Sequence, residues 1–383
     1  MDAVVFLALL AGFVLLIVGG ESLVRGAGSL ARSLGMSSLV VGLTVVSFTT
    51  SAPELAVSTG AALSGYPGLA VGNVVGSNIA NVLFVLGAAA LFVPLLVRSQ
   101  VVRTDIPVMV LLSVVVLVMA LDGTVGRLDG AVLVAALVVY ITVTVVVSRR
   151  RAAAAPEEEG VGGADGGPGT ARSGGRARRV LVDVGLVLLG TALLVVGARL
   201  LVYGASEIAA ALGVSDLLIG LTVVAIGTSL PELVTCVVAV VRGERDMAVG
   251  NVVGSNLFNI GAVLGLTAVV APSGIAVAPE ALRFDLPIMV AVALVLLPLS
   301  LTRLGVARWE GALLVGFYAA YIAYLVLEAT DHAALLPYSA AMLWFVLPIT
   351  VLWLVSVAVY EWTTRQRGGD RSEFSSPVAV NKD

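Results

Sequence analysis

The stretch Gly42–Leu55, with the sequence GLTVVSFTTSAPEL, returns 178 positions later at Gly220–Leu233 as GLTVVAIGTSLPEL. A second stretch, AVGNVVGSN, occurs at Ala70–Asn78 and again, unchanged and at the same offset, at Ala248–Asn256. Two separate motifs repeated at one offset indicate an internal duplication. We therefore expect these stretches to occupy equivalent places in two related halves of the fold.

The rest of the chain is too apolar for a water-soluble protein. Of its 383 residues, 59% are hydrophobic and 12% are charged, whereas soluble domains carry about 25% charged residues. The net charge of −3 and the lack of a sustained basic surface outside the loops count against nucleic-acid binding. The single cysteine, Cys236, cannot form an internal disulfide or a thiolate metal site. The composition predicts a polytopic membrane protein.

Apolar segments of about 20 residues can cross a bilayer as helices, and the sequence predicts eleven of them: 3–29, 36–64, 69–95, 105–121, 127–148, 180–208, 214–241, 247–271, 285–302, 307–327 and 337–360. The repeat then divides the chain into five parts. These are a first five-helix repeat at 1–148, a flexible cytoplasmic linker at 149–179, a second repeat at 180–327, an extra transmembrane helix at 328–360 and a cytoplasmic tail at 361–383.

The basic residues predict how these helices are oriented in the cell membrane. With the N-terminus outside, all lysines and arginines except Arg127, Arg199 and Arg283 fall on the inner side, as the positive-inside rule requires. The linker and the C-terminus are then cytoplasmic. Because each repeat has five helices, an odd number, the two copies must cross the membrane in opposite directions. Inverted repeats of this kind are typical of secondary transporters.

Glu54 and Glu232 are the only repeat-matched carboxylates deep inside the predicted spans. A charge at this depth costs about 2.5 kcal/mol or more, so it must face a cavity, a partner or an ion. Each follows a proline, Pro53 or Pro231, and proline leaves the carbonyl four residues earlier without its helical hydrogen bond. Freed carbonyls, hydroxyls and carboxylates form an all-oxygen set, which suits Ca²⁺ or Na⁺.

The next helix of each repeat carries a polar stripe. Its side chains are spaced by four residues and so share one face of a helix: Asn73, Ser77 and Asn81 in the first repeat, and Asn251, Ser255 and Asn259 in the second. Glycine pairs beside the stripes, Gly72/Gly76 and Gly250/Gly254, allow helices to approach closely. We expect the stripes to face the glutamates.

These motifs resemble those of the cation/Ca²⁺ exchanger superfamily, specifically the prokaryotic sodium/calcium exchangers. The resemblance covers 42–87 and 220–265 and implies an all-α inverted repeat of five plus five helices, with four cation sites between the second and third helices of each repeat. Carried over by position, it implies twelve ligands: Ser47, Thr50, Ser51, Glu54, Ser77, Asn81, Ala225, Thr228, Ser229, Glu232, Ser255 and Asn259. Ser47 and Ala225 would act through their backbone carbonyls.

The chain departs from the family pattern at three places. Thr49 stands where the motif has glycine, whereas Gly227 keeps it, so the first kink should be stiffer. Asn259 occupies a position that is acidic in some members, including potassium-dependent exchangers, so potassium co-transport is not expected. The eleventh span lies outside the ten-helix core.

The resemblance and the charge count predict a Na⁺/Ca²⁺ antiporter without a cofactor, whose only substrates are the two ions. Two glutamates balance one Ca²⁺, while three Na⁺ would leave one positive charge, so exchange would be electrogenic. Two protons would balance the glutamates equally well, which keeps an H⁺/Ca²⁺ or broader divalent-cation antiporter as the alternative. A cation channel lacks a filter-like segment here. An intramembrane hydrolase would need a serine or aspartate nucleophile with a base, and the single histidine, His332, lies in a predicted loop outside the core.

Overall fold

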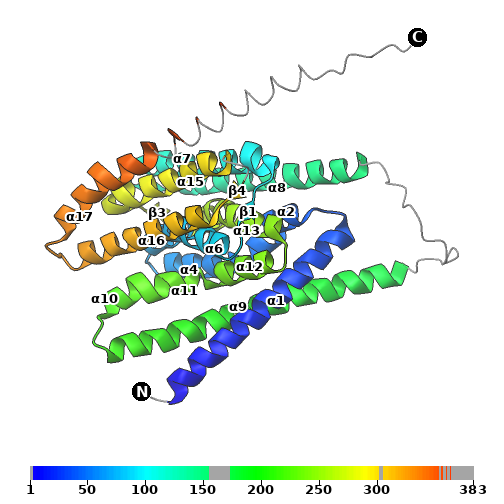
Figure 1. Ribbon diagram of the computed structural model, residues 1–383, viewed down its shortest axis with the longest axis horizontal. Helices are drawn as coiled ribbons and strands as arrows, with labels where there is room; N and C mark the ends of the chain where they lie inside the picture. Colours follow the sequence, from blue (N-terminus) through cyan, green and yellow to red (C-terminus); the bar gives the residue numbers. More distant parts are fainter. Residues whose placement is uncertain are drawn as a thin grey trace, which may run out of the picture.

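The computed structural model describes residues 3–154, 173–301 and 305–352, together with positions 355, 356, 359 and 363. Figure 1 shows a bundle of helices with four very short strands between them. Short π-helical segments, labelled η, interrupt many of the helices; η4 alone is a 3₁₀ turn.

The first repeat comprises α1 (Ala3–Leu34), α2 (Ser38–Val41), η1 (Gly42–Val46), α3 (Ser47–Thr50), α4 (Ala52–Leu63), α5 (Gly68–Ala80), η2 (Asn81–Leu86), α6 (Gly87–Phe92), β1 (Leu95–Leu96), η3 (Val101–Asp105), α7 (Ile106–Met119), η4 (Ala120–Asp122), β2 (Thr124–Val125) and α8 (Arg127–Ala154). The second repeat comprises α9 (Ser173–Ala211), α10 (Asp216–Ile219), η5 (Gly220–Val224), α11 (Ala225–Thr228), α12 (Leu230–Val241), α13 (Arg245–Phe258), η6 (Asn259–Leu264), α14 (Gly265–Val270), β3 (Ile275–Ala276), η7 (Ala281–Asp285), α15 (Leu286–Leu301), β4 (Gly305–Val306) and α16 (Arg308–Ala329). After the repeats come α17 (Leu335–Ala341) and η8 (Met342–Val346).

The described helices agree with the predicted number of spans. Nine are long and apolar enough to cross a bilayer, and two bent helix pairs raise the number to eleven if each pair crosses once. The bent pairs are the segments with the repeated motif: α2 to α3 meets α4 at 41°, and η5 to α11 meets α12 at 51°. The second span of each repeat is therefore a broken helix.

The two repeats share local structure that the fold would not otherwise require. Each has π-helical segments at matched places: η1 and η5, η2 and η6, η3 and η7. Each also has a tyrosine that donates a 2.9 Å hydrogen bond to an aspartate, Tyr140 to Asp105 and Tyr321 to Asp285. Insertions of this type are rare and occur mostly at functional sites, so their duplication indicates that both halves serve one site.

Contacts between the repeats hold the halves together. The long helices α1 and α9 cross side by side over much of their length (Figure 1). Glycines allow the backbones of α1 and α9 to approach closely. A Cβ on Gly12 would lie 2.8 Å from the Gly197 carbonyl oxygen, and one on Gly197 would lie 2.8 Å from the Gly12 carbonyl oxygen. Two short antiparallel ribbons, β1 with β4 and β2 with β3, join loops of opposite repeats.

The predicted linker, 149–179, is shorter in the structure than expected. Helix α8 continues to Ala154, because arginine and alanine, which fill positions 149–154, are strong helix formers, and α9 already begins at Ser173. The positions between them lie outside the described residues. The eleventh span is present as Leu335–Leu352, and none of that window is buried against the rest of the chain. Of the predicted tail, 361–383, only Thr363 is described.

Candidate cation-binding site

Glu54 and Glu232 lie at the centre of the bundle, each in the first turn of the helix that follows a break. The breaks are at Ser51 and Ser229, whose ψ angles of −1° and 4° depart from the value near −42° of a regular α-helix. The prolines stand at the start of α4 and α12, where a missing N–H costs nothing. The chain therefore breaks two residues before each proline, and each glutamate lies beside a helix N-terminus, where the dipole favours negative charge.

The carboxylates are buried without partners of opposite charge. Glu54 is 3% exposed and Glu232 is 2% exposed, and the described ion pairs include neither. Within the described part of the chain, Oε2 of Glu54 and both carboxylate oxygens of Glu232 accept no hydrogen bond, and the Ser51 and Ser229 hydroxyls are likewise unpaired. Buried polar groups are nearly always paired. Orphaned oxygens of this number, drawn from matched positions, fit ligands of a hard cation.

In one half of the site, α3 is in close contact with the polar stripe of α13. The Thr50 hydroxyl lies 3.3 Å from the Asn251 amide oxygen and 3.3 Å from the Ser255 hydroxyl. The Ser47 hydroxyl donates to the Asn251 carbonyl oxygen at 3.0 Å. All four side chains are buried. Thr50 and Ser255, predicted from different repeats, are thus brought together.

In the other half, α11 is not engaged in this way. The Thr228 hydroxyl donates to the Ala225 carbonyl oxygen of its own helix at 3.0 Å, and Thr228 is only half-buried. The Asn73 amide turns instead to α4, where it donates to the Ser58 hydroxyl at 2.9 Å. The predicted ligands Ala225 and Thr228 are therefore near the site but do not reproduce the contacts of Ser47 and Thr50.

The last positions of the two stripes lie at the point where α5 and α13 pass into π-helices. Asn81 is 1% exposed and neither atom of its amide has a partner. Asn259 donates to the Asn78 amide oxygen at 3.1 Å and keeps its own oxygen unpaired. Asn78 also donates to the Asn256 carbonyl oxygen at 3.4 Å. Asn78 and Asn256 therefore brace the site, a role that their exact repetition could have indicated.

The two glycine pairs show the same asymmetry, because they differ in how closely another helix approaches them. A Cβ on Gly250 would lie 2.6 Å from the Leu39 carbonyl oxygen, and one on Gly254 would lie 2.7 Å from the Leu43 carbonyl oxygen. At the matched positions, Gly72 and Gly76, no atom of the described residues lies within 4 Å of the added Cβ. The helix formed by α2 and α3 is therefore packed onto α13, whereas the equivalent helix formed by α10 and α11 stands away from α5.

The space beside α5 is a cavity of about 330 Å³. Its walls come from α4, α5, α9 and the segment from η5 to α12, and they include Glu54, Asn73 and Thr228. Arg199 also lines it, an unexpected positive charge near a cation site. The sequence identified Arg199 only as one of three basic residues that the predicted orientation leaves on the outer side. The cavity lies beside the parts of α4 and α5 that lead to the turn between these helices. We call the end of the bundle with the turn between α12 and α13, Arg242–Arg245, the basic face.

Comparison with known proteins gives consistent matches over most of the chain. A family model described as sodium/calcium exchanger protein matches residues 4–146 and 182–327. The chain is 39% identical over 316 residues to the putative antiporter CaxA of Alkalimonas amylolytica, which covers 82% of this chain and 95% of the relative. It is 34% identical over 353 residues to the sodium/calcium exchanger MaX1 of Methanosarcina acetivorans, covering 85% and 99%.

A solved structure matches as well. The sodium-calcium exchanger NCX_Mj, soaked with 2.5 mM Na⁺ and 0.1 mM Ca²⁺, has a TM-score of 0.69 and 32% sequence identity to this chain. The match covers 84% of this chain and 99% of that one.

Proposed function

This chain belongs to the sodium/calcium exchanger family, and we propose that it is a secondary antiporter that exchanges Na⁺ for Ca²⁺ across the cell membrane by alternating access. The observation that carries the proposal is the pair of buried, unpaired glutamates with orphaned oxygens around them. A structural role would have provided arginine or hydrogen-bond partners for these carboxylates. The names of MaX1 and NCX_Mj as sodium/calcium exchangers support the same ions.

We assign the cation ligands to the twelve positions predicted from sequence. The carboxylates of Glu54 and Glu232 would hold Ca²⁺. The hydroxyls and amides around them would complete the Ca²⁺ site and form the Na⁺ sites, together with the backbone carbonyls of Ser47 and Ala225. Both carbonyls lie in the last turns before the helix breaks, where half-helix ends can coordinate cations.

The charge balance explains why such a site would exchange ions instead of leaking them. With no cation bound, two carboxylates would have to move through an apolar passage, which is unfavourable. One Ca²⁺ balances them, and so would a set of Na⁺ ions, with three leaving a net positive charge. The site should therefore change sides only when loaded, and exchange of three Na⁺ for one Ca²⁺ would move charge.

The asymmetry of the two repeats supports alternating access. Since the repeats carry nearly the same motif, the packed and open arrangements can be exchanged between them. We propose that the basic face is cytoplasmic, as the distribution of arginines indicates. The cavity beside α5 would then open to the outside, and this conformation would be the outward-facing one.

The test is uptake of ⁴⁵Ca²⁺ into proteoliposomes loaded with Na⁺ and diluted into Na⁺-free buffer. We expect uptake that needs the Na⁺ gradient and persists with a protonophore. Because three Na⁺ leave for each Ca²⁺ that enters, one positive charge moves out per cycle, so an inside-positive potential should stimulate uptake and an inside-negative potential should slow it. Uptake driven by a proton gradient alone would support the H⁺/Ca²⁺ alternative. Uptake that needs no counter-ion would indicate a channel. Glu54→Gln provides the inactive control.

A further inference from the structure

Arg199 places a positive charge at the wall of the cavity that reaches Glu54. It lies on α9, lines the cavity that reaches Glu54, and makes no hydrogen bond or ion pair within the described part of the chain. The other charged residue among the cavity walls is Glu54 itself. We propose that Arg199 determines cation selectivity at this entrance, by disfavouring divalent ions more than monovalent ones. This inference rests on the proposed exchange function.

The selectivity follows from the charge of the ion. Coulomb repulsion is proportional to that charge, so its effect on the local concentration of Ca²⁺ is the square of its effect on Na⁺. At a separation of about 10 Å and the dielectric constant of water, the concentration falls about twofold for a monovalent and about fourfold for a divalent cation. The effect should weaken as salt screens the charge. Arg199 would thus weaken Ca²⁺ binding from the outside relative to Na⁺.

The repeat-matched residue of Arg199 is Glu21, which has the opposite charge. If the repeats exchange conformations, Glu21 would line the equivalent cavity at the basic face. At this matched position the two entrances would then differ in the sign of the charge.

The experiment is a measurement of external half-saturation by Ca²⁺ and by Na⁺ for Arg199→Gln in proteoliposomes at low ionic strength. We expect the half-saturating concentration to fall about fourfold for Ca²⁺ and about twofold for Na⁺, and both changes to become smaller at high ionic strength. Arg283→Gln, which removes a charge that is predicted to lie on the same side and is not among the cavity-lining residues, is the matched control. Equal changes for both ions, no change, or the same change in Arg283→Gln would overturn the proposal. Native protein without Na⁺-dependent uptake would instead overturn the proposed function.

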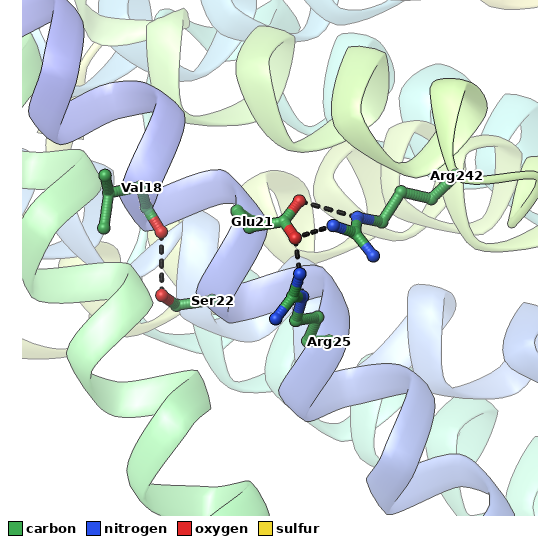
Figure 2. A network of polar contacts seen from close by, with 5 residues as sticks. All are labelled: Val18, Glu21, Ser22, Arg25 and Arg242. Carbon is green, nitrogen blue, oxygen red and sulfur yellow. Dashed lines mark hydrogen bonds and ion pairs between the residues drawn. The ribbon is translucent and has the colours of Figure 1, made fainter.

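A second inference comes from a different observation, the ion pairs of the basic face. The Glu21 carboxylate lies between two guanidinium groups (Figure 2): Nε of Arg25 is 2.5 Å away on the same helix, and Nε of Arg242 donates to it at 2.6 Å. Arg242 caps the C-terminus of α12. The contact therefore ties α1 to the turn between α12 and α13.

Three further contacts tie the same turn and the start of α13 to other parts of the first repeat. Glu244 accepts a hydrogen bond from the Ser38 hydroxyl at 2.7 Å and lies 3.9 Å from the Arg32 guanidinium. Asp246 lies 2.5 Å from the guanidinium of Arg98, in the loop after β1. The acidic partners are about three-quarters buried, whereas the arginine side chains are 54% to 73% exposed, so solvent and salt should partly screen these pairs.

The opposite end of the bundle cannot form this network. Glu21 and Arg242 correspond to Arg199 and Ser64, and Arg32 and Glu244 correspond to Ala210 and Tyr66. Closing that end would bring no matched pair of opposite charges together. We infer that the network of Glu21, Arg25 and Arg242, with the contacts of Glu244 and Asp246, is a latch. It holds the basic face closed and biases the protein toward the conformation seen here.

The latch can be tested without measuring transport. Val224 lines the open cavity, and its repeat-matched residue Val46 is fully buried; a cysteine at Val46 should react with impermeant maleimide only when the basic face opens. The native Cys236 is buried, and its background is measured in the protein without the new cysteine.

In a Val46→Cys background, Glu21→Gln and Arg242→Gln should each raise the labelling rate about two- to fivefold, as expected for a partly buried ion pair. The double variant should label no faster than either single variant, because both remove the same pair. High salt should raise labelling of the latched protein toward that of the variants. Glu207→Gln, an exposed carboxylate on α9, is the control and should have no effect. Unchanged labelling, or multiplicative effects in the double variant, would show that the pair is not a latch.

Discussion

Alanine at Gly250 or at its repeat-matched partner Gly72 adds the same methyl group in two different surroundings. At Gly250 the new Cβ would lie 2.6 Å from the Leu39 carbonyl oxygen and 3.0 Å from the Leu43 backbone nitrogen, whereas at Gly72 nothing lies within 4 Å. Because backbone atoms cannot turn aside, Gly250→Ala should destabilise this conformation by about 1–3 kcal/mol. The balance should move about fivefold to about 150-fold toward the conformation open at the basic face.

Gly72→Ala should have the reverse effect. The added methyl group has space in this conformation and should not destabilise it. If the repeats exchange their packing, however, Gly72 will contact the helix formed by α10 and α11, just as Gly250 now contacts α2 and η1. Maleimide labelling of cysteines at Val46 and Val224 reports the two conformations. Gly250→Ala should raise labelling at Val46 and lower it at Val224, and Gly72→Ala should do the opposite.

Both alanine variants should exchange ions more slowly, because a complete cycle needs both conformations. Gly60→Ala, on α4 with open space around it, controls for the gain in helix propensity, which is about 1 kcal/mol for any such change. If Gly250→Ala and Gly72→Ala shifted labelling in the same direction, the repeats would not exchange their packing and the reasoning would fail.

Three further predictions concern the site and the topology. Glu54→Gln or Glu232→Gln should each abolish Ca²⁺ exchange in proteoliposomes while leaving a folded, inserted protein, because a neutral amide is easier to bury; near-native exchange would remove the site assignment. Asn259→Asp adds a third carboxylate that competes for protons, so exchange should fall more steeply as the pH is lowered, and an unchanged pH profile would place this position outside the site. Impermeant thiol reagents should reach a cysteine in the segment 149–179 only from the cytoplasmic side and one at Thr330 only from outside, and labelling of both from one side would contradict the orientation.

Much of the fold could be predicted because its signals are local. A bilayer needs long apolar runs, and duplication leaves repeated motifs, so the spans and the inverted repeat could be derived from the sequence. Glu54 and Glu232 could be predicted as site residues because a charged carboxylate inside the membrane is unfavourable unless it faces a cavity, a partner or an ion. The comparison with known exchangers confirms the family and the fold.

The exact place of each helix break was not predictable in this way. Proline indicated a kink but not that it would begin a new helix after Ser51 and Ser229. The π-helical segments were also not predicted, because one extra residue in a helical turn produces no periodic pattern in the sequence. Arg199 was missed since its importance depends on the cavity that it lines, and a cavity is a property of tertiary packing.

The conformation itself could not follow from the motifs, because both repeats carry them. Gly42–Leu55 and Gly220–Leu233 are nearly the same sequence, yet one is packed against its neighbouring stripe and the other is open. Equal sequences give no reason for either half to be the packed one. The preference must come from positions where the repeats differ, and the pairs Glu21/Arg199 and Arg242/Ser64 are such positions. We therefore attribute ion binding to what the repeats share and the preferred direction of opening to what they do not.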